Sequence, residues 1–307
     1  MINRANIMTT VVENRDRYIQ TICTEIITTK QPSQTQVSAN QLLPYPSFAD
    51  GDSQSSVAIA RCLAQLIGYN EPKRKRHLSV QTTSMRFETA TCSFVQNAFD
   101  SMYYLRPGRW TYAPYVTATN QFEHDGRLAE LAPALQDYSA FKATPGRDNC
   151  FFAGPDIVVS RLPLSDTDID DVDTALSMGG DAALVRSLRR VNLSGIPCEL
   201  MHASISCKWT IRMGDTSAVP SEVFNLIRNR NGRLPHIVLV TAESLPTRLA
   251  LVALGTVDLD CVYHFALSEL SEAVRMVGSA DQQDVLELMI SERRLRDIAD
   301  LPFDLAK

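Results

Sequence analysis

The sequence predicts an α/β fold, with a central mixed β-sheet flanked by helices. Two observations support this class: from residue 110 onward continuous β-branched and aromatic runs recur, and helical patterns stand before, between and after them. Continuous apolar strands are typical of sheets that are covered on both faces, and interleaved helices provide that cover. With 307 residues, 45% of them hydrophobic, the chain is long enough to bury such a core.

Helical patterns occupy the region before the first strand. Residues 10–30 predict a first helix, and residues 55–68 predict a second, which stops at Gly68, the residue type expected at a helix C-terminus. A longer helix is predicted over residues 84–105, where apolar side chains recur at three- and four-residue spacing.

The strand-like runs cover residues 110–118, 155–162, 200–212, 235–243 and 259–267. A helix over residues 221–230, with Ser221 as its N-cap, separates the third run from the fourth. The tail, residues 280–302, is predicted to be helical as well. We expect a single domain over residues 1–307, in which residues 1–46 form a helical N-terminal arm and linker, because the end of that stretch is rich in Gln, Ser and Pro.

Composition excludes several classes of protein. The seven cysteines are scattered and form no CxxC pair, and the five histidines show no zinc-binding spacing, so neither a disulfide framework nor a zinc site is indicated. No apolar run approaches the roughly 18 residues that span a membrane. There is also no glycine-rich phosphate loop. We therefore expect a soluble, cytoplasmic protein without a membrane partner.

The net charge of −5 argues mildly against nucleic-acid binding, but the basic residues are clustered. They gather in residues 73–77, 186–190 and 228–233. An acidic protein can carry a basic cleft, and the same clusters also fit ordinary solvated helix faces and loops.

Lys208 lies inside a strand-like run, between Cys207 and Trp209. Because side chains along a strand alternate between its faces, Lys208 and Ser206 point one way while Cys207 and Trp209 point the other. Lys208 therefore belongs to a polar face of its strand and not to the core.

Asp156 is the acid expected beside Lys208. Pro155 cannot donate a hydrogen bond to a neighbouring strand, so it belongs at the start of its own strand, which places Asp156 at the mouth of the sheet. An aspartate at one strand end and a lysine on the next strand form the minimal PD…xK arrangement of metal-dependent nucleases. Phosphodiester cleavage needs a carboxylate to hold a hard divalent cation and a cation or base near the attacking water. Lysine can serve in the second role.

The common form of this motif has a second acid two residues before the lysine, where this chain has Ser206. Glu222 is the candidate replacement, because it lies in the first turn of a predicted helix, where the helix dipole favours an ionised acid. Glu88, on the long early helix, is a further candidate. By spacing alone, these residues equally fit a surface lysine, a turn-forming aspartate and a helix-capping glutamate.

Long blocks of the chain carry a more specific signal, namely "HASISCKWTIR", "NLIRNRNGRLPHIVLVTAE", "ALGTVDLDCVYHFAL" and "RLRDIADLPFDLA", with "PDIVVSR" and "FETATCSFVQNAF" upstream. In this order the blocks resemble the NgoMIV family of restriction endonucleases, in the CCGG-reading group of type II enzymes. The resemblance implies a restriction-endonuclease-like core of the PD-(D/E)xK superfamily.

The resemblance also implies roles for the candidate residues. Asp156 and Glu222 would be metal ligands, Lys208 would orient the attacking water, Ser206 would lie beside it, and Glu88 would be an auxiliary acid. Mg²⁺ would be the cofactor and double-stranded DNA the substrate, cut to leave 5′ overhangs. The family implies a homo-oligomer, a dimer of dimers that engages two DNA sites, since palindromic DNA suits a two-fold symmetric reader. A cognate methyltransferase would act on the same site without being bound.

The base-reading segment departs from the family pattern. The family has an arginine followed, two and three positions later, by an acid and a second arginine, which suit G·C pairs. Arg212 matches the first, but Gly214 stands at the acid and Asp215 at the second arginine. Asp215 could act as the acid after a shift of one residue. The target is therefore expected to be short, palindromic and G/C-rich, but it need not be a CCGG-containing site.

Other segments are expected to contact DNA. Gln81 and Asp50 fall at positions that the family uses near the bases, although each also fits a plain surface or turn residue. Arg228 and Arg230, in a basic cluster, are expected to bind phosphates without reading sequence. Two rival functions stay open: a methylation-dependent or repair nuclease on the same fold, and a DNA-binding protein that has lost cleavage.

Overall fold

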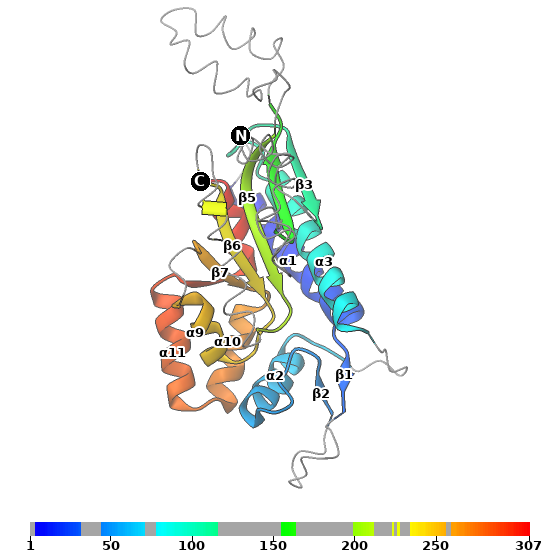
Figure 1. Cartoon of the computed structure of the whole chain (residues 1–307), viewed down its shortest axis with the longest axis vertical. Helices are drawn as coiled ribbons and strands as arrows, with labels where there is room; N and C mark the ends of the chain where they lie inside the picture. The colour runs from blue at the N-terminus through cyan, green and yellow to red at the C-terminus, as the bar shows by residue number, and fades with distance from the viewer. Residues whose placement is uncertain are drawn as a thin grey trace, which may run out of the picture. The chain divides into compact units, whose positions relative to one another are not determined.

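Figure 1 shows the computed structural model of the chain, which describes residues 4–31, 44–70, 78–115, 155–163, 199–211, 223, 226–227, 234–255 and 259–307. The chain forms two compact units. The first unit comprises residues 1–106, 205–220 and 237–307, and the second comprises residues 107–204 and 221–236. The first unit is therefore assembled from three stretches that are separate in the sequence.

Six of the described strands are hydrogen-bonded neighbours in the order β3-β4-β5-β6-β7-β8. Their bounds are β3 Trp110–Pro114, β4 Ile157–Arg161, β5 Leu200–Lys208, β6 His236–Thr241, β7 Cys261–His264 and β8 Leu295–Asp297. β3 and β4 pair antiparallel, whereas β6, β7 and β8 pair parallel. The sheet is therefore mixed, and with its flanking helices it confirms the predicted α/β class.

The first unit holds the described helices that cover the parallel strands. They are α1 Arg4–Thr21, α2 Gln54–Leu66, α3 Val80–Asp100, α9 Pro246–Ala253, α10 Leu267–Val277, α11 Ala280–Ser291 and α12 Leu301–Leu305, with a π-helix at Ile22–Ile26 and a 3-10 helix at Ile298–Asp300. α1 packs on α3, α2 on α10, and α9 on α11 (Figure 1). β7 is buried along its whole length, as a parallel strand covered on both faces should be.

The predicted apolar face of α3 is confirmed. Phe87 and Phe94 are buried on it, and the helix starts at Ser79, whose hydroxyl accepts a hydrogen bond of 3.0 Å from the Thr82 amide. On the same face, the Tyr18 hydroxyl of α1 lies 2.8 Å from the Thr91 hydroxyl. The residues whose spacing predicted α3 thus form the face on which α1 packs.

The second unit contains the antiparallel pair of β3 and β4, which runs from Trp110 opposite Arg161 to Pro114 opposite Ile157. The Arg161 guanidinium lies 5.8 Å from the centroid of the Trp110 ring, a cation–π arrangement. The expected helix over 221–230 lies almost wholly outside the described residues, of which Val223, Leu226 and Ile227 are helical.

The helix predicted over residues 280–302 is not continuous: it is wrong for residues 292–297, and helical structure returns at Ile298. α11 ends at Ser291, the amides of Arg293 and Arg294 close onto the carbonyls of Ile290 and Met289, and β8 follows. This is the hydrogen-bond pattern of a Schellman ending, and Arg293 has the left-handed φ of 55° that glycine usually provides. Because an arginine occupies that position, the sequence lacks the usual stop signal.

The first helix was predicted too late. It starts by Arg4 and gives way after Thr21 to the π-helix, and Thr29–Lys30 (β1) pairs antiparallel with Tyr45–Pro46 (β2). α9 and α10 were not predicted. Neither has a side chain that caps its N-terminus. Pro246, at the first position of α9, is a helix-start signal that the sequence analysis did not use.

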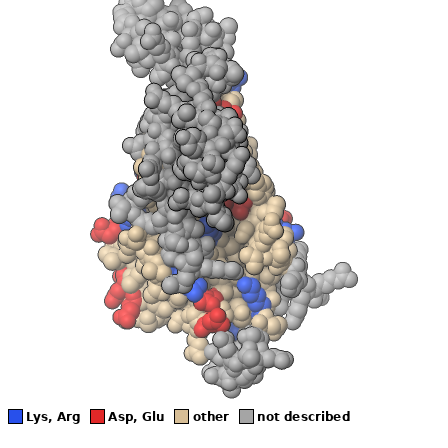
Figure 2. Space-filling view, in the orientation of Figure 1, with Lys and Arg blue, Asp and Glu red and all other residues tan. Residues whose placement is uncertain are grey.

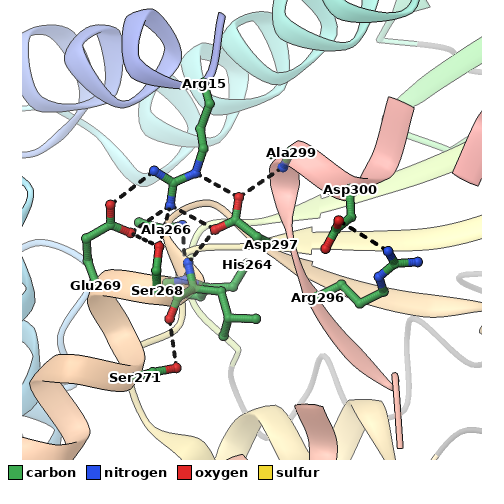
Figure 3. A network of polar contacts seen from close by, with 11 residues as sticks. Arg15, His264, Ala266, Ser268, Glu269, Ser271, Arg296, Asp297, Ala299 and Asp300 are labelled. Atoms are coloured by element: carbon green, nitrogen blue, oxygen red, sulfur yellow. Dashed lines mark hydrogen bonds and ion pairs between the residues drawn. The ribbon is translucent and has the colours of Figure 1, made fainter. Parts of the chain in front are cut away.

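Within the first unit, Arg15 joins α1 to α10 and β8 (Figure 3). Its guanidinium, on α1, donates to both oxygens of Glu269 at 3.0 and 2.7 Å and to both oxygens of Asp297 at 2.8 Å each. Asp297 also accepts the backbone amides of Leu267 and Ala299 at 2.9 and 3.0 Å. Burial by itself raises the pKa of Glu269, but the bonds and charge of Arg15 outweigh it and hold the pKa below its usual value. Glu269 and Asp297 therefore share one arginine as their ion-pair partner.

Replacing Arg15 by alanine is expected to destabilise the protein by about 3 kcal/mol, because two partly buried carboxylates lose their counter-charge. The measurement is the free energy of unfolding in urea at neutral pH. Arg275→Ala is the matched control, since Arg275 pairs with Glu272 on an exposed helix surface. The role assigned to Arg15 would be contradicted if both variants unfolded at the wild-type urea concentration.

His264 is a buried histidine at the end of β7. Its Nδ1 accepts the Ala266 amide at 3.1 Å, and its Nε2 has no hydrogen-bond partner among the described residues. Burial lowers the pKa of His264 to about 4, although the carboxylates of Asp297 and Glu269 act in the opposite direction. The folded protein therefore keeps this imidazole neutral.

The free energy of unfolding is expected to fall as the pH is lowered from about 6.5 to about 4, because of His264. Between its ordinary value of 6.5 and about 4 the unfolded chain binds a proton that the folded chain does not, so the loss begins near pH 6.5 and is complete below about 4. The contribution is about 3 kcal/mol. His264→Asn, which keeps an acceptor for the Ala266 amide but does not titrate, should show a flatter pH dependence of unfolding free energy. Equal slopes in both proteins would refute this assignment.

Candidate active site

At the end of β5, side chains of the core alternate with the candidate site residues, as the alternation of side chains along a strand predicts. Ile205, Cys207 and Trp209 are buried, and the Trp209 ring contacts Phe87 and Phe48 edge-on, with ring centroids 5.2 and 6.0 Å away. Lys208, between two of these residues, is only half-buried. Its side chain is therefore directed away from the face that carries the core.

Ser206 and Glu88 belong to the same unit as this lysine. Ser206 is buried two residues before Lys208, on the same side of the strand. Glu88 is half-buried on α3, directly after Phe87, whose ring contacts Trp209. This aromatic contact holds the middle of α3 against the end of β5, so the segments that carry Glu88 and Lys208 are packed together.

Asp156 opens β4 in the second unit, as the preceding proline predicted. Pro155 is buried, Asp156 is half-buried, and the strand starts at Ile157. The Asp156 carbonyl accepts the amide of Tyr115 at 2.8 Å, and Tyr115 has a left-handed φ of 61°. The backbone on which the aspartate sits is thus fixed by the end of β3.

Glu222 lies outside the described residues, and so do Arg212, Asp215, Arg228 and Arg230. The carboxylate pair proposed for a metal is therefore represented in the structure by Asp156 alone. Carboxylate oxygens are hard ligands of the kind that Mg²⁺ prefers, so the donor type at the start of β4 fits such an ion.

Gln81 and Asp50 are the described residues that were expected near DNA bases. Gln81 is exposed in the first turn of α3. Asp50 forms the turn that its "DG" sequence predicted: its carboxylate accepts the Asp52 amide at 3.1 Å, and its carbonyl accepts the Ser53 amide at 3.1 Å. The second carboxylate oxygen of Asp50 forms an ion pair with Arg248.

Arg248 and Glu243 were missed by the sequence analysis. Arg248 lies in the first turn of α9, where it pairs with Asp50 and where its Nη1 lies 3.9 Å from an oxygen of Glu243. Glu243 is fully buried, two residues after the end of β6. No motif marks either residue, because a lone acid at the end of an apolar strand does not reveal which backbone amides it will meet.

The described surface carries both signs of charge. On the face shown in Figure 2, basic and acidic side chains stand close to one another, in keeping with a net charge of −5. The basic clusters expected to bind phosphates at 73–77 and 228–233 lie outside the described residues. Within the described ranges, none of the helices combines the length and the apolar character that crossing a membrane requires.

Comparison with known proteins decides the family. The model of the NgoMIV restriction enzyme family matches residues 18–307. The chain belongs to this family. It is also 40% identical over 265 residues to the type II restriction enzyme NgoMIV of Neisseria gonorrhoeae, a match that covers 85% of this chain and 89% of that enzyme.

Membership of the NgoMIV restriction enzyme family confirms the resemblance inferred from the sequence blocks. The chain is a restriction endonuclease, a site-specific nuclease that acts on DNA and uses a divalent metal, and its α/β sheet is a restriction-endonuclease fold. The matched region includes every residue proposed for the active site.

Proposed function

We propose that this restriction endonuclease makes Mg²⁺-dependent double-strand cuts, with 5′ overhangs, at a short palindromic G/C-rich DNA site. The observation that carries the proposal is the pair of strand positions: Asp156 directly precedes β4, and Lys208 is the last residue of β5. The family match over residues 18–307 supports it.

The metal site consists of the carboxylates of Asp156 and Glu222, with Glu88 as an auxiliary acid. When bound, Mg²⁺ supplies an acidified water and neutralises charge on the phosphate. The carboxylate groups of these residues provide the oxygen ligands that this ion prefers.

Lys208 orients the attacking water. Its ammonium group is a compact charge on a flexible stem, so it can contact the water and the scissile phosphate. The buried neighbours Cys207 and Trp209 anchor the strand on either side of it. Ser206, on the same side of β5, supplies a hydroxyl next to the lysine.

The DNA site is read by Arg212 together with Asp215, since arginine grips guanine and a carboxylate accepts from cytosine. Gln81 also contacts the bases, and its exposure in the first turn of α3 supports this role. Asp50 contributes only where DNA competes with Arg248 for its carboxylate. Arg228 and Arg230 hold phosphates.

A dimer of dimers that engages two sites, in the cytoplasm, completes the proposal. Two-fold symmetric DNA requires a two-fold symmetric pair of subunits. A cognate methyltransferase protects the host DNA by modifying the same site.

Digestion of a plasmid library with Mg²⁺, followed by sequencing of the fragment ends, tests this function. Discrete ends with a common sequence would identify the site, and the overhang would be visible in the same reads. Digesting methylated and unmethylated copies of one plasmid tests the methylation-dependent alternative, which the altered segment at Gly214 and Asp215 permits. Intact DNA in every digest would refute the proposal.

Lys208→Ala is expected to lower the cleavage rate by about a hundredfold to ten thousandfold. Binding to a duplex that carries the identified site should stay close to wild type, because the lysine acts on the water. Lys307→Ala, at an exposed lysine paired with Asp304, is the control and should cleave normally. A Lys208→Ala enzyme that cuts at the wild-type rate would exclude this residue from catalysis.

Arg212→Lys is expected to reduce discrimination between the identified site and a site with one altered base pair by about tenfold to a hundredfold. Lysine keeps the charge but lacks the fork that grips guanine at two atoms. Arg230→Ala is the contrast: it should weaken binding to all duplexes alike and lower the salt dependence. Unchanged discrimination in Arg212→Lys would show that the bases are read elsewhere.

A further inference from the structure

The carboxylate of Glu243 is buried at the end of β6, within the first unit. The residue has no solvent exposure, and burial, the largest influence, raises the pKa of its carboxyl group. A charge in such a place is costly unless it is hydrogen-bonded. Here the hydrogen-bond donors are backbone amides: Ile211 donates to one oxygen at 2.9 Å and Leu245 to the other at 3.0 Å.

Ile211 is held at both of its backbone groups. Its amide binds Glu243, and its carbonyl accepts a hydrogen bond of 3.3 Å from Nη1 of Arg248. The same nitrogen of Arg248 lies 3.9 Å from the Glu243 carboxylate. The acid and the arginine therefore clamp a single residue of the segment that follows β5.

This clamp continues the pairing of β5 with β6 beyond the ends of both strands. The Lys208 carbonyl accepts the Ala242 amide at 3.4 Å, and three residues further along the Glu243 side chain takes the place of a strand partner for Ile211. The Thr241 hydroxyl accepts the Glu243 amide at 3.1 Å and fixes the acid's own backbone. The segment from Lys208 to Ile211 is thus held by a hydrogen bond at each of its two ends.

We propose that Glu243 is a positioning residue for DNA recognition, which fixes Ile211 and thereby sets where Arg212 starts relative to Lys208. This inference rests on the proposed function, in which Arg212 reads bases and Lys208 acts in cleavage. Glu243 touches neither DNA nor metal in this role. It acts through the backbone of its neighbour.

The position of the clamp supports this role. The clamped residue directly precedes Arg212, and the clamping arginine also pairs with Asp50, a described acid that is expected near the bases. Buried polar contacts of this kind fix one backbone arrangement and not several. A recognition arginine needs that constraint, because a shift of about 1 Å breaks a bidentate contact with a base.

Glu243→Gln tests the inference. The glutamine side chain has one acceptor oxygen and one NH₂ group. The backbone N–H of either Ile211 or Leu245 must then face this NH₂ group, which is itself a donor, and that hydrogen bond is lost. The probes are two duplexes, one with the site identified by end sequencing and one with a single base pair altered. The ratio of their kcat/KM values should fall at least about tenfold in this variant.

Asp297→Asn is the matched control for loss of a partly buried carboxylate. Asp297 likewise accepts two backbone amides and pairs with an arginine, but it belongs to the Arg15 cluster (Figure 3). Both variants should lower the unfolding temperature. Assayed well below both transitions, only Glu243→Gln should lose discrimination, and equal losses in both variants would overturn the proposal.

A double-mutant cycle with Arg212→Ala separates positioning from general damage. If Glu243 acts through Arg212, adding Glu243→Gln to Arg212→Ala lowers the ratio no further, whereas an additive loss would overturn the inference. If Arg212→Ala alone keeps the wild-type ratio, base reading by Arg212 has failed. The wild-type digest reports separately on cleavage. Should Glu243→Gln not fold, Glu243→Asp keeps the charge but is too short to reach both amides, and the same loss is expected of it.

Discussion

The double carboxylate clamp of Arg15 is the interaction on which the first unit depends. Parallel strands such as β7 and β8 need cover on both faces, and that cover is supplied by helices distant in sequence. Arg15 joins α1 to α10 through Glu269 and to β8 through Asp297. A planar guanidinium that is bidentate to two acids fixes orientation as well as proximity. Arg15 thereby fixes α1, which packs on α3, against β8 at the edge of the parallel strands.

The end of β5 shows how the same strand serves stability and chemistry. Its odd-numbered residues Ile205 and Cys207 bury their side chains, while Ser206 and Lys208 face the other way. A lysine in an apolar run therefore causes no conflict, since the period of the strand separates the two sets of side chains. β5 ends at Lys208. Beyond it, the buried carboxylate of Glu243 accepts the amide of Ile211, in place of a backbone carbonyl of a neighbouring strand.

The sequence predicted those features that local patterns record. Apolar spacing located α2 and α3, continuous apolar runs located β4 to β7, and Pro155 placed Asp156 at a strand start. The serine caps of the two helices, Ser53 and Ser79, lie before the residues at which the sequence predicted their starts. β8 was missed because Arg293 adopts the left-handed conformation that normally signals itself by glycine. Glu243 and Arg248 could not be predicted, because their meaning depends on which amides the folded chain brings to them. The same holds for Asp50, whose ion pair is made with a helix far away in the sequence.

The discontinuity of the first unit bears on how the enzyme is made. Synthesis delivers α1 and α3 first, yet the acids that pair with Arg15 come from the last part of the described chain. Contacts between distant stretches are slow to form and wait for the later stretch to leave the ribosome. The same delay applies to the strand that ends in Lys208, whose neighbour β6 is made later. A nascent chain that lacks β7, α10 and β8 therefore has neither the parallel strand pairs of the first unit nor the partners of Arg15.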